Sequence, residues 1–338
     1  MKTIITGGAG FIGCNAAARA LARGEAVVVL DNLSRPGSAE NLDWLSTLGR
    51  FEFLRVDLRD APAVIDAFHR HRDARQVLHL AGQVAVTTSV ENPRADFEAN
   101  AFGTLNVLEG MRLRVPQAAL VYASTNKVYG ALEHLEIVEQ NARYAYRSNP
   151  EGVAETEPLD FHSPYGCSKG AADQYVRDYH RIFGLRTVVF RQSCIYGYRQ
   201  FGVEDQGWVA WFAIAAGQGR PMRVFGDGKQ VRDVLFIDDL LDAFDAAFAK
   251  IDRVAGRVYN IGGGPTNAIS LREFLGYLEA RSARLDVSYH PWRPGDQRVF
   301  VTDIRRSGAE LEWQPKTDWR HGVHLLCGWV AENAGLFV

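Results

Sequence analysis

Apolar residues occur in short consecutive runs over the first part of the chain, and helical patterns separate these runs. The apolar runs cover residues 3–5, 26–30, 51–56, 76–80, 118–122 and 186–190. The helical patterns cover residues 11–23, 62–70, 96–113 and 165–183. A strand that is apolar at consecutive positions is typical of a parallel sheet with helices on both faces. The alternation therefore predicts an α/β fold, a Rossmann-type doubly wound parallel sheet whose ligand crevice lies at the carboxyl ends of its strands.

The rhythm changes after about residue 190, where the predicted elements become shorter. We expect residues 1–190 to form the Rossmann domain and residues 191–338 to form mainly a smaller substrate-binding lobe, with some segments returning to the first domain. The polar stretch 131–162 is unusually long for a connection between a strand and a helix. It is either a flap over the substrate or a surface loop without a role in the site. Long ordered loops beside a site tend to be functional, which favours the flap.

Composition and charge exclude several classes of protein. With 338 residues, of which 47% are hydrophobic and 23% are charged, the chain can bury a large core. Its net charge of -2 provides no positive field for nucleic acid. The sequence contains no apolar stretch of membrane-spanning length, and Met1-Lys2 leads directly into a predicted strand. The four cysteines are far apart and form no CxxC pair, so we expect no metal site and a location in the reducing cytoplasm.

A glycine-rich turn at residues 6–13, TGGAGFIG, joins the first predicted strand to the first predicted helix. Gly7 allows a tight turn, and Gly10 lets the backbone approach a pyrophosphate. Gly13 lets the helix pack close to the sheet while its N-terminal amides face the anion. This context, rather than the glycine triplet alone, predicts that the domain at residues 1–190 binds a dinucleotide.

Asp31 ends the second apolar run, about 20 residues beyond the glycines, where a carboxylate can bind the adenosine ribose hydroxyls. A carboxylate would repel a 2′-phosphate, so NAD is favoured over NADP, although Arg35 could serve such a phosphate. Alternatively, Asp31 is only a turn residue at the end of a strand. Asp57 ends the third run and could meet the adenine, or it could cap the following helix. Small residues at 80–82 permit close approach to the dinucleotide.

Tyr165 and Lys169 are four residues apart, after Ser163-Pro164, a typical helix start. This spacing places the phenol and the ammonium one turn apart on the same face of a helix. A positive charge near the phenol favours its deprotonated form, which makes tyrosine a usable base. Alternatively, the two side chains are an exposed pair on an amphipathic helix. Thr125 follows the fifth strand at the predicted crevice, where its hydroxyl could hold a substrate oxygen while Tyr165 takes the proton.

These motifs resemble the extended short-chain dehydrogenase/reductases, specifically the NAD-dependent sugar epimerase/dehydratase family. The resemblance covers essentially the whole chain and includes TGGAGFIG (6–13), DNLSR (31–35), HLAGQVAV (79–86), ASTNKVYG (123–130), SPYGCSK (163–169), VRDVLFIDD (231–239) and RPGD (293–296). It implies NAD as cofactor, a nucleotide-sugar substrate, and a homo-oligomer, either a dimer or a tetramer. It also implies that arginines 232 and 293 hold the substrate's phosphates. The alternative for both arginines is surface ion pairing.

The resemblance assigns residues to three groups. The catalytic residues are Thr125, Tyr165 and Lys169, with Ser124 as a further candidate. The cofactor-binding residues are Gly7, Gly10, Phe11, Ile12, Gly13, Asp31, Asn32, Ser34, Arg35, Asp57, Leu58, Leu80, Ala81, Gln83, Asn100, Tyr165 and Lys169. The substrate-binding residues are Gln83, Asn126, Gln206, Trp208, Arg232 and Arg293.

Departures from the family pattern narrow the expected reaction. The 4,6-dehydratases carry Thr-Asp-Glu where this chain has Thr125-Asn126-Lys127, so the acid and base for dehydration are missing. The strings at 31–45, 82–93, 159–175 and 205–212 resemble the branch that inverts carbon 2 of CDP-hexoses, either CDP-paratose to CDP-tyvelose or a CDP-glucose-type sugar. The first alternative is a UDP-hexose 4-epimerase of the same family. The second is a dinucleotide-sensing protein without chemistry, which the presence of both Tyr165 and Lys169 disfavours.

Overall fold

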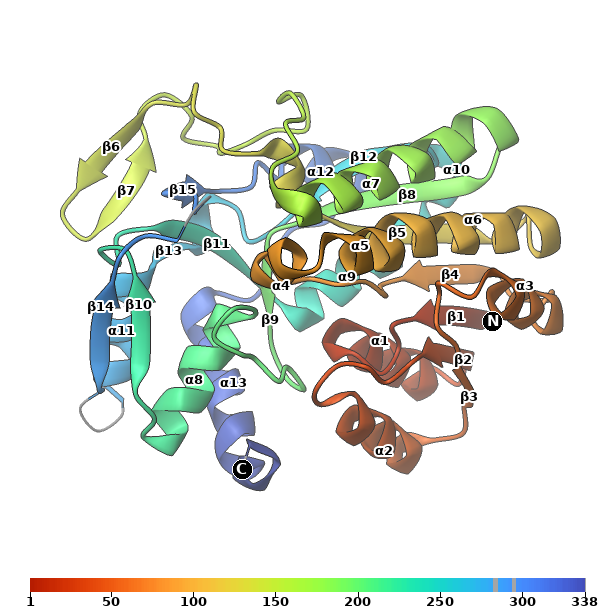
Figure 1. Ribbon diagram of the computed structural model, residues 1–338, viewed down its shortest axis with the longest axis horizontal. Coiled ribbons are helices and arrows are strands. Elements are labelled where there is room, and N and C mark those ends of the chain that lie inside the picture. Colours follow the sequence, from red (N-terminus) through yellow and green to blue (C-terminus); the bar gives the residue numbers. More distant parts are fainter. Residues whose placement is uncertain (282–284, 294–295, 338) are drawn as a thin grey trace.

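A seven-stranded parallel sheet forms the centre of the larger domain (Figure 1). The structure is a computed structural model that describes residues 1–281, 285–293 and 296–337. In spatial order the strands are β12 (Val258–Ile261), β8 (Arg186–Gln192), β5 (Ala119–Thr125), β4 (Gln76–His79), β1 (Lys2–Thr6), β2 (Ala26–Asp31) and β3 (Glu52–Arg55). The order reverses direction between β1 and β4, as in a doubly wound fold. The predicted fold class is confirmed.

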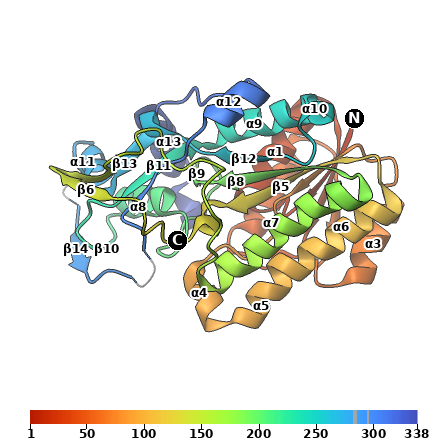
Figure 2. The same cartoon turned by 90° about the horizontal axis from the view of Figure 1, so that it is seen from above.

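Helices cover both faces of this sheet, as its uninterrupted apolar strands predict (Figure 2). Successive side chains on a strand point to opposite faces, so Ile4 packs into one cluster and Ile5 into the other. One cluster includes side chains of α3 (Ala61–Arg70), α6 (Gly103–Arg114) and α7 (Ser163–Phe183). The other includes side chains of α1 (Phe11–Ala22), α2 (Ser38–Leu48) and α9 (Ile237–Ala249).

The smaller lobe is built around short strands from the second half of the chain. Its four-stranded sheet consists of β9 (Cys194–Tyr196), β11 (Val231–Phe236), β13 (Ala268–Ser270) and β15 (Val299–Phe300). A parallel pair consists of β10 (Met222–Phe225) and β14 (Val287–His290). The helices beside these strands are α8 (Trp208–Gln218), α11 (Leu271–Glu279) and α13 (Trp319–Glu332). Short elements elsewhere are α10 (Ile251–Val254), α12 (Arg305–Leu311), η3 (Pro265–Asn267) and η4 (Ala334–Phe337).

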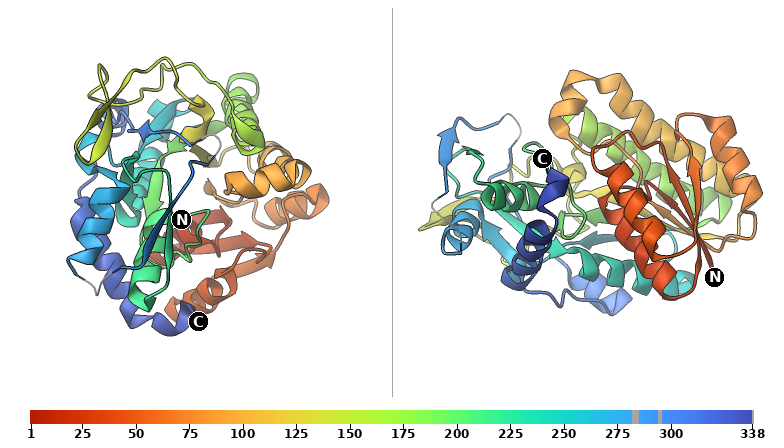
Figure 3. Two further views of the ribbon diagram at one scale, coloured as in Figure 1. Left: turned by 60° about the vertical axis from the view of Figure 1, so that its left-hand side comes forward. Right: turned by 90° about the horizontal axis from the view of Figure 1, so that it is seen from below.

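The two parts of the molecule share one apolar core. The cluster under α1 and α9 continues without a break into side chains of α8, α11 and α13. Figure 3 shows the same arrangement from two further sides, with the N-terminus in the larger domain and the C-terminus beside the smaller lobe. Because the core is continuous, the lobes pack directly against each other. None of the helices in the described ranges is both long and apolar enough to cross a bilayer.

Two segments between residues 86 and 114 differ from the sequence prediction. The helix expected at 96–113 is interrupted: α5 (Pro93–Phe97) is followed by a π-helix, η1 (Glu98–Phe102), before α6 begins. A short helix, α4 (Val86–Glu91), precedes α5. β12, from beyond residue 190, joins the large sheet beside β8. The division into domains at residue 190 stays a prediction.

The 131–162 segment contains a hairpin of β6 (Ile137–Gln140) and β7 (Arg143–Tyr146). Arg143 forms an ion pair with Glu273 at the start of α11, and the Tyr144 hydroxyl donates to Asp227 at 2.5 Å. The hairpin is therefore anchored on the smaller lobe. Whether it acts as a flap over the substrate stays a prediction.

Candidate active site

The turn between β1 and α1 is shaped for close approach of backbone to backbone. Gly7 has a φ of +67°, and a Cβ atom on it would lie 2.7 Å from the Ala81 nitrogen at the end of β4. A Cβ atom on Gly13 would lie 2.1 Å from the Gly7 carbonyl oxygen. Only glycine fits these two positions without moving the backbone. The turn therefore leaves the N-terminus of α1 clear of side chains, and this fits the pyrophosphate of a dinucleotide.

Asp31, at the end of β2, orders the loop that follows it. Its carboxylate accepts the Ala9 N–H at 3.0 Å and the Leu33 N–H at 2.8 Å. Burial raises the pKa of Asp31, whereas the backbone donors and Arg35 lower it. Asp31 is thus a strand-end turn residue that lies against the glycine turn, and its predicted ribose contact stays a prediction. The Ser34 N–H donates to Asn32 Oδ1 at 3.0 Å, which extends the ordered loop.

Asp57 does not cap the helix that follows it. Asp60 has that role, because its side chain accepts the Ala63 N–H at 3.0 Å at the start of α3. Asp57 instead accepts from Asn32 at 3.1 Å and from the Arg59 guanidinium at 2.7 Å. Hydrogen bonds from Arg59 hold the pKa of the Asp57 carboxyl well below its usual range. The helix-cap alternative is wrong, and the predicted adenine contact stays a prediction.

Tyr165 and Lys169 are buried at the start of α7, with 7% and 6% of their surfaces exposed. The exposed-pair alternative is therefore wrong. The helix begins at Ser163, one residue earlier than predicted, with His162 at the N-cap position, and the Ser163 Oγ accepts the Gly166 N–H at 3.2 Å. Lys169 Nζ donates to the Ala123 carbonyl at 2.6 Å and lies 4.4 Å from the centre of the Tyr122 ring. Burial lowers the pKa of Lys169 to about 7.

Burial raises the pKa of Tyr165 to about 12, and this differs from the expectation that Lys169 favours the phenolate. A hydrogen bond with Thr125 and the charge of Arg35 act in the opposite direction but do not outweigh burial. Lys169 does not contribute to this pKa shift, and its ammonium donates to the Ala123 carbonyl. Tyr165 thus holds its proton, with the Thr125 hydroxyl beside it.

Ser124 has a different partner from its neighbour Thr125. Its hydroxyl donates to Asp173 at 2.9 Å, and Asp173 forms a buried two-bond ion pair with Arg191. Adjacent residues on a strand face opposite sides of the sheet, so only one of the two hydroxyls can meet Tyr165. The structure brings Thr125 to Tyr165 and Ser124 to the ion pair, and a catalytic role of Ser124 stays a prediction.

Asn100 lies in the π-helix, a feature that often marks functional sites. Its side-chain amide donates to Asp96 at 3.1 Å and to Ser168 at 3.0 Å, and it accepts the Gln83 N–H at 2.9 Å. The Gln83 side chain bonds to its own segment at Ala85. Sequence analysis missed Asp96 and Ser168, because nothing in the sequence indicates that α5 packs against α7.

Two of the substrate-binding candidates, Arg232 and Arg293, lie in β11 and in the segment that leads to β15. Arg232 donates to the carbonyls of Val231 at 2.8 Å and Gln297 at 2.6 Å. It has no carboxylate partner within the described ranges, which excludes surface ion pairing there. Arg293 does form an ion pair, at 2.8 Å from Asp205, and its guanidinium lies 3.8 Å from the centre of the Phe225 ring. Pro294 and Gly295 of the RPGD motif lie outside the described residues.

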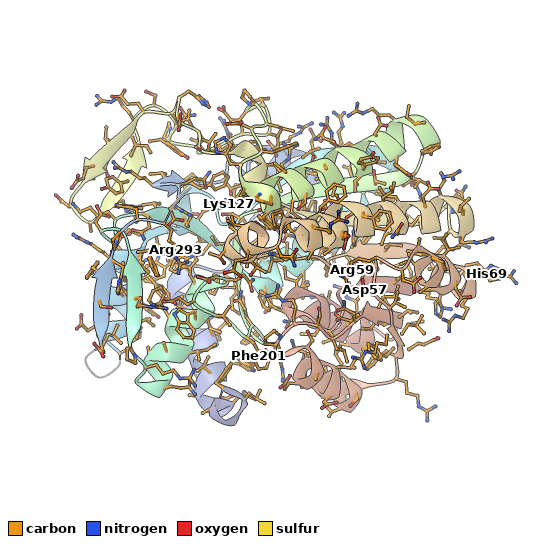
Figure 4. The ribbon with its side chains drawn as sticks, in the orientation of Figure 1. Asp57, Arg59, His69, Lys127, Phe201 and Arg293 are labelled. Atoms are coloured by element: carbon orange, nitrogen blue, oxygen red, sulfur yellow. The ribbon has the colours of Figure 1, made fainter. Side chains whose placement is uncertain are left out.

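Other candidates lie between the two lobes. Arg35 donates to Gln206 at 2.5 Å and so links the loop after β2 to the segment before α8. Trp208 packs edge-on against Phe274 of α11. Asn126 is buried directly after β5, in the short helix η2 (Asn126–Tyr129). Figure 4 shows Lys127 of η2 near the start of α7, on the side facing the lobe that carries Arg293, with Asp57 and Arg59 farther along the large sheet.

Comparison with known proteins adds independent information. The profile of the NAD dependent epimerase/dehydratase family matches residues 3–262. CDP-paratose 2-epimerase of Salmonella typhi is 47% identical over 338 aligned residues, with 98% of this chain and 99% of that protein covered. UDP-glucose 4-epimerase of Mycolicibacterium smegmatis is 33% identical, with 96% of each chain covered.

Solved structures agree with these sequence matches. UDP-glucose 4-epimerase of Thermus thermophilus, in complex with NAD, superposes with a TM-score of 0.82 at 35% identity, covering 99% of this chain and 100% of that one. UDP-glucose 4-epimerase of Thermotoga maritima, with UDP-glucose, superposes with a TM-score of 0.84 at 30% identity and the same coverage. These structures share the architecture of this chain over its whole length.

Proposed function

Because the chain belongs to the NAD-dependent epimerase/dehydratase family and is an enzyme that uses NAD, we propose that it inverts carbon 2 of a CDP-hexose. The substrate would be CDP-paratose, giving CDP-tyvelose, or a CDP-glucose-type sugar. The observation that carries the proposal is the 47% identity to a CDP-paratose 2-epimerase along nearly the full length of both chains. The buried group of Thr125, Tyr165 and Lys169 supports it.

The glycine turn at 6–13, Asp31 and the loop after it would hold NAD, which when bound accepts a hydride from the sugar and returns it. Tyr165, as the phenolate that the positive charge of a bound nicotinamide ring would favour, would take the proton of the carbon-2 hydroxyl as the carbon is oxidised. It would return this proton when the carbon is reduced from its other face. Thr125 would hold the sugar oxygen beside Tyr165. Lys169 would keep the neighbouring backbone and the helix start in place, since its ammonium binds the end of β5.

A UDP-hexose 4-epimerase is the second candidate, favoured by the 33% identity to such an enzyme over 96% of both chains. The same catalytic group can act at either carbon, because the pose of the sugar decides which carbon meets Tyr165. The two candidates differ in which sugar position inverts. The absence of an acid pair at Asn126 and Lys127 argues against a dehydratase.

The deciding experiment supplies CDP-paratose, CDP-glucose and UDP-galactose separately to the purified enzyme and identifies the products by NMR. We expect inversion at carbon 2 of a CDP-hexose, with deuterium placed at carbon 2 retained there in the product. Deuterium at carbon 4 should have no effect on the rate. Inversion at carbon 4 of the UDP-hexose, with every CDP-hexose unchanged, would refute the proposed regiochemistry.

A second assay separates an epimerase from a dehydrogenase. The hydride returns to the same sugar, so NAD should co-purify and turnover should consume no added NAD. NADH that accumulates in proportion to substrate would identify a dehydrogenase instead.

We also propose that the enzyme is a cytoplasmic homo-oligomer, either a dimer or a tetramer. Six of the exposed large apolar side chains belong to α5, η1, α6 and α7, on one side of the sheet: Phe97, Phe102, Leu113, Tyr175, Ile182 and Phe183. An apolar surface of this kind is typical of an interface between subunits, and a second copy of the chain is the partner that the resemblance implies. The cysteines are free thiols, as is usual in a reducing compartment.

A further inference from the structure

Lys127 is a half-buried cation that no carboxylate of the described residues pairs with. Among the described residues, its ammonium donates one long hydrogen bond, from Nζ to Gln297 Oε1 at 3.3 Å. Burial lowers the pKa of Lys127 to about 8, and the charge of Arg232 acts in the same direction, while Asp296 offsets part of the effect. A desolvated ammonium beside a second cation costs free energy unless an anion joins it.

The surroundings of Lys127 are rich in donors. Arg232 is in electrostatic range and bonds to carbonyl groups alone among the described residues. Gln192 ends β8, where it is the register partner of Thr125, and it is 7% exposed. Its Nε2 has no hydrogen-bond acceptor within the described part of the chain. Two cations and an unused amide donor fit a ligand that carries negative charge and several acceptor oxygens, such as a diphosphate.

Lys127 also lies close to the reaction centre. Its backbone N–H donates to the Thr125 hydroxyl at 3.2 Å, and Thr125 is close enough to Tyr165 to lower the pKa of that phenol. The lysine therefore lies between Thr125, which would hold the sugar oxygen, and Arg232, which the family resemblance assigns to the substrate's phosphates. Figure 4 shows it at this boundary between the large domain and the smaller lobe.

We infer that Lys127 binds the sugar-side phosphate of the substrate and thereby presents carbon 2 of the sugar to Tyr165. This inference rests on the proposed function. The diphosphate is attached to carbon 1, so carbon 2 is its direct neighbour and carbon 4 is across the ring. An enzyme that acts at carbon 2 must hold that phosphate beside Thr125 and Tyr165, and Lys127 supplies the positive charge there.

The test compares CDP with CMP as ligands of the NAD-loaded enzyme. CDP carries the phosphate that corresponds to the sugar-side phosphate, and CMP lacks it. Lys127→Met removes the charge and keeps a similar length, Lys127→Arg keeps the charge, and Lys316→Met removes an exposed lysine that pairs with Asp242 in another part of the molecule. Calorimetry gives both affinities, and NAD content and melting temperature show that each variant is folded.

For Lys127→Met we expect CDP affinity to fall about 10- to 100-fold, the range for a lost charge-assisted hydrogen bond to a phosphate, with CMP affinity unchanged. Lys127→Arg should keep CDP affinity within about fivefold, and Lys316→Met should match the wild type. The KM for the CDP-hexose should rise in parallel with the loss of CDP affinity. If Lys127→Met is poorly folded, Lys127→Gln replaces it in the same comparison.

Two results would overturn the inference: unchanged CDP affinity in Lys127→Met, or an equal loss of CDP and CMP affinity. These outcomes are distinct from failure of the proposed function, which the wild-type product assay decides. If the wild type proved to be a UDP-hexose 4-epimerase, the UDP and UMP pair would test the phosphate contact in the same way. The carbon-2 argument would then be wrong whatever the phosphate result.

Discussion

At the scale of single residues, burial decides the charge state of the groups in the site. The pKa of Tyr165 is raised to about 12 and those of Lys127 and Lys169 are lowered to about 8 and 7, and in each case burial is the largest cause. Each group is pushed toward its neutral form, because the interior disfavours charge. Tyr165 therefore holds its proton tightly, whereas Lys127 and Lys169 hold theirs more weakly than exposed lysines do.

Replacement of Tyr165 by phenylalanine tests its role in that proton transfer. We expect Tyr165→Phe to lower turnover by at least about a hundredfold, the scale for loss of a general acid or base, while NAD content and melting temperature stay close to the wild type. Tyr175→Phe is the matched control, since Tyr175 is an exposed tyrosine of the same helix. A Tyr165→Phe enzyme with most of its epimerase rate would remove this residue from the mechanism.

The buried His79 makes stability depend on pH. Its ring lies 2.7 Å from the Thr6 hydroxyl and 2.9 Å from the Thr104 hydroxyl, and burial lowers its pKa to about 3. Below pH 6.5 the unfolded chain binds a proton at this histidine that the folded chain cannot bind, so the free energy of unfolding falls as pH decreases. Each unit by which the pH falls between about 6.5 and 3 should lower the free energy of unfolding by about 1.4 kcal/mol.

Urea unfolding at pH 7 and pH 5 measures this effect. Between pH 7 and pH 5 the free energy of unfolding of His79→Gln should fall by about 2 kcal/mol less than that of the wild type. His69→Gln, which changes an exposed histidine of α3, should keep the wild-type dependence. Equal pH dependence of the wild type and His79→Gln would show that the histidine is not buried in its neutral form.

At the scale of elements, the first turns of helix α7 hold several residues of the site. Tyr165, Lys169 and Asp173 follow one another at single-turn spacing along α7. The first lies beside Thr125, the second binds the end of β5, and the third binds Arg191 of β8. One helix thus sets the positions of the phenol and of the two strands beside it.

The β1–α1 turn gives a prediction at this scale. Gly13→Ala should reduce the NAD that co-purifies and lower stability by about 1–3 kcal/mol, because the added carbon would meet the backbone of the turn at Gly7 and Gly8. Gly276→Ala is the control, since Gly276 lies in helix α11 and an added Cβ meets nothing within 4 Å. NAD content is read from the absorbance of the denatured protein. Full NAD content in Gly13→Ala would show that the turn tolerates a side chain and that its shape does not govern binding.

At the scale of the whole molecule, the apolar surface over α5, η1, α6 and α7 predicts self-association. Ile182 is 66% exposed on α7, and Ile182→Glu places a charge in that surface. We expect Ile182→Glu to convert the oligomer to a smaller species in size-exclusion chromatography with light scattering. Leu48→Glu, an exposed apolar residue of α2, should leave the mass unchanged. A monomeric wild type, or an Ile182→Glu oligomer of wild-type mass, would exclude this surface as the interface.

The amino-acid sequence was sufficient to predict the alternation of strands and helices, the glycine turn and the helix start at Ser163. These features depend on residues close together in the chain, through periodicity, glycine's conformational freedom and capping. The similarity to a family could also be read from local strings. This is why the fold class, the cofactor and the pairing of Tyr165 with Lys169 on one helix could be predicted.

Only the folded structure shows which side chains that are distant in the sequence lie in contact. It placed Ser124 on Asp173 while Thr125 met Tyr165, brought Asp96 and Ser168 to Asn100, and added β12 to the large sheet. It also placed Lys127 near Arg232, and neither cation forms an ion pair with a carboxylate in the described part of the chain. Such contacts depend on strand order and on the packing of helices over the sheet. Burial then sets the pKa values, and no local pattern in the sequence specifies how deeply a side chain is buried.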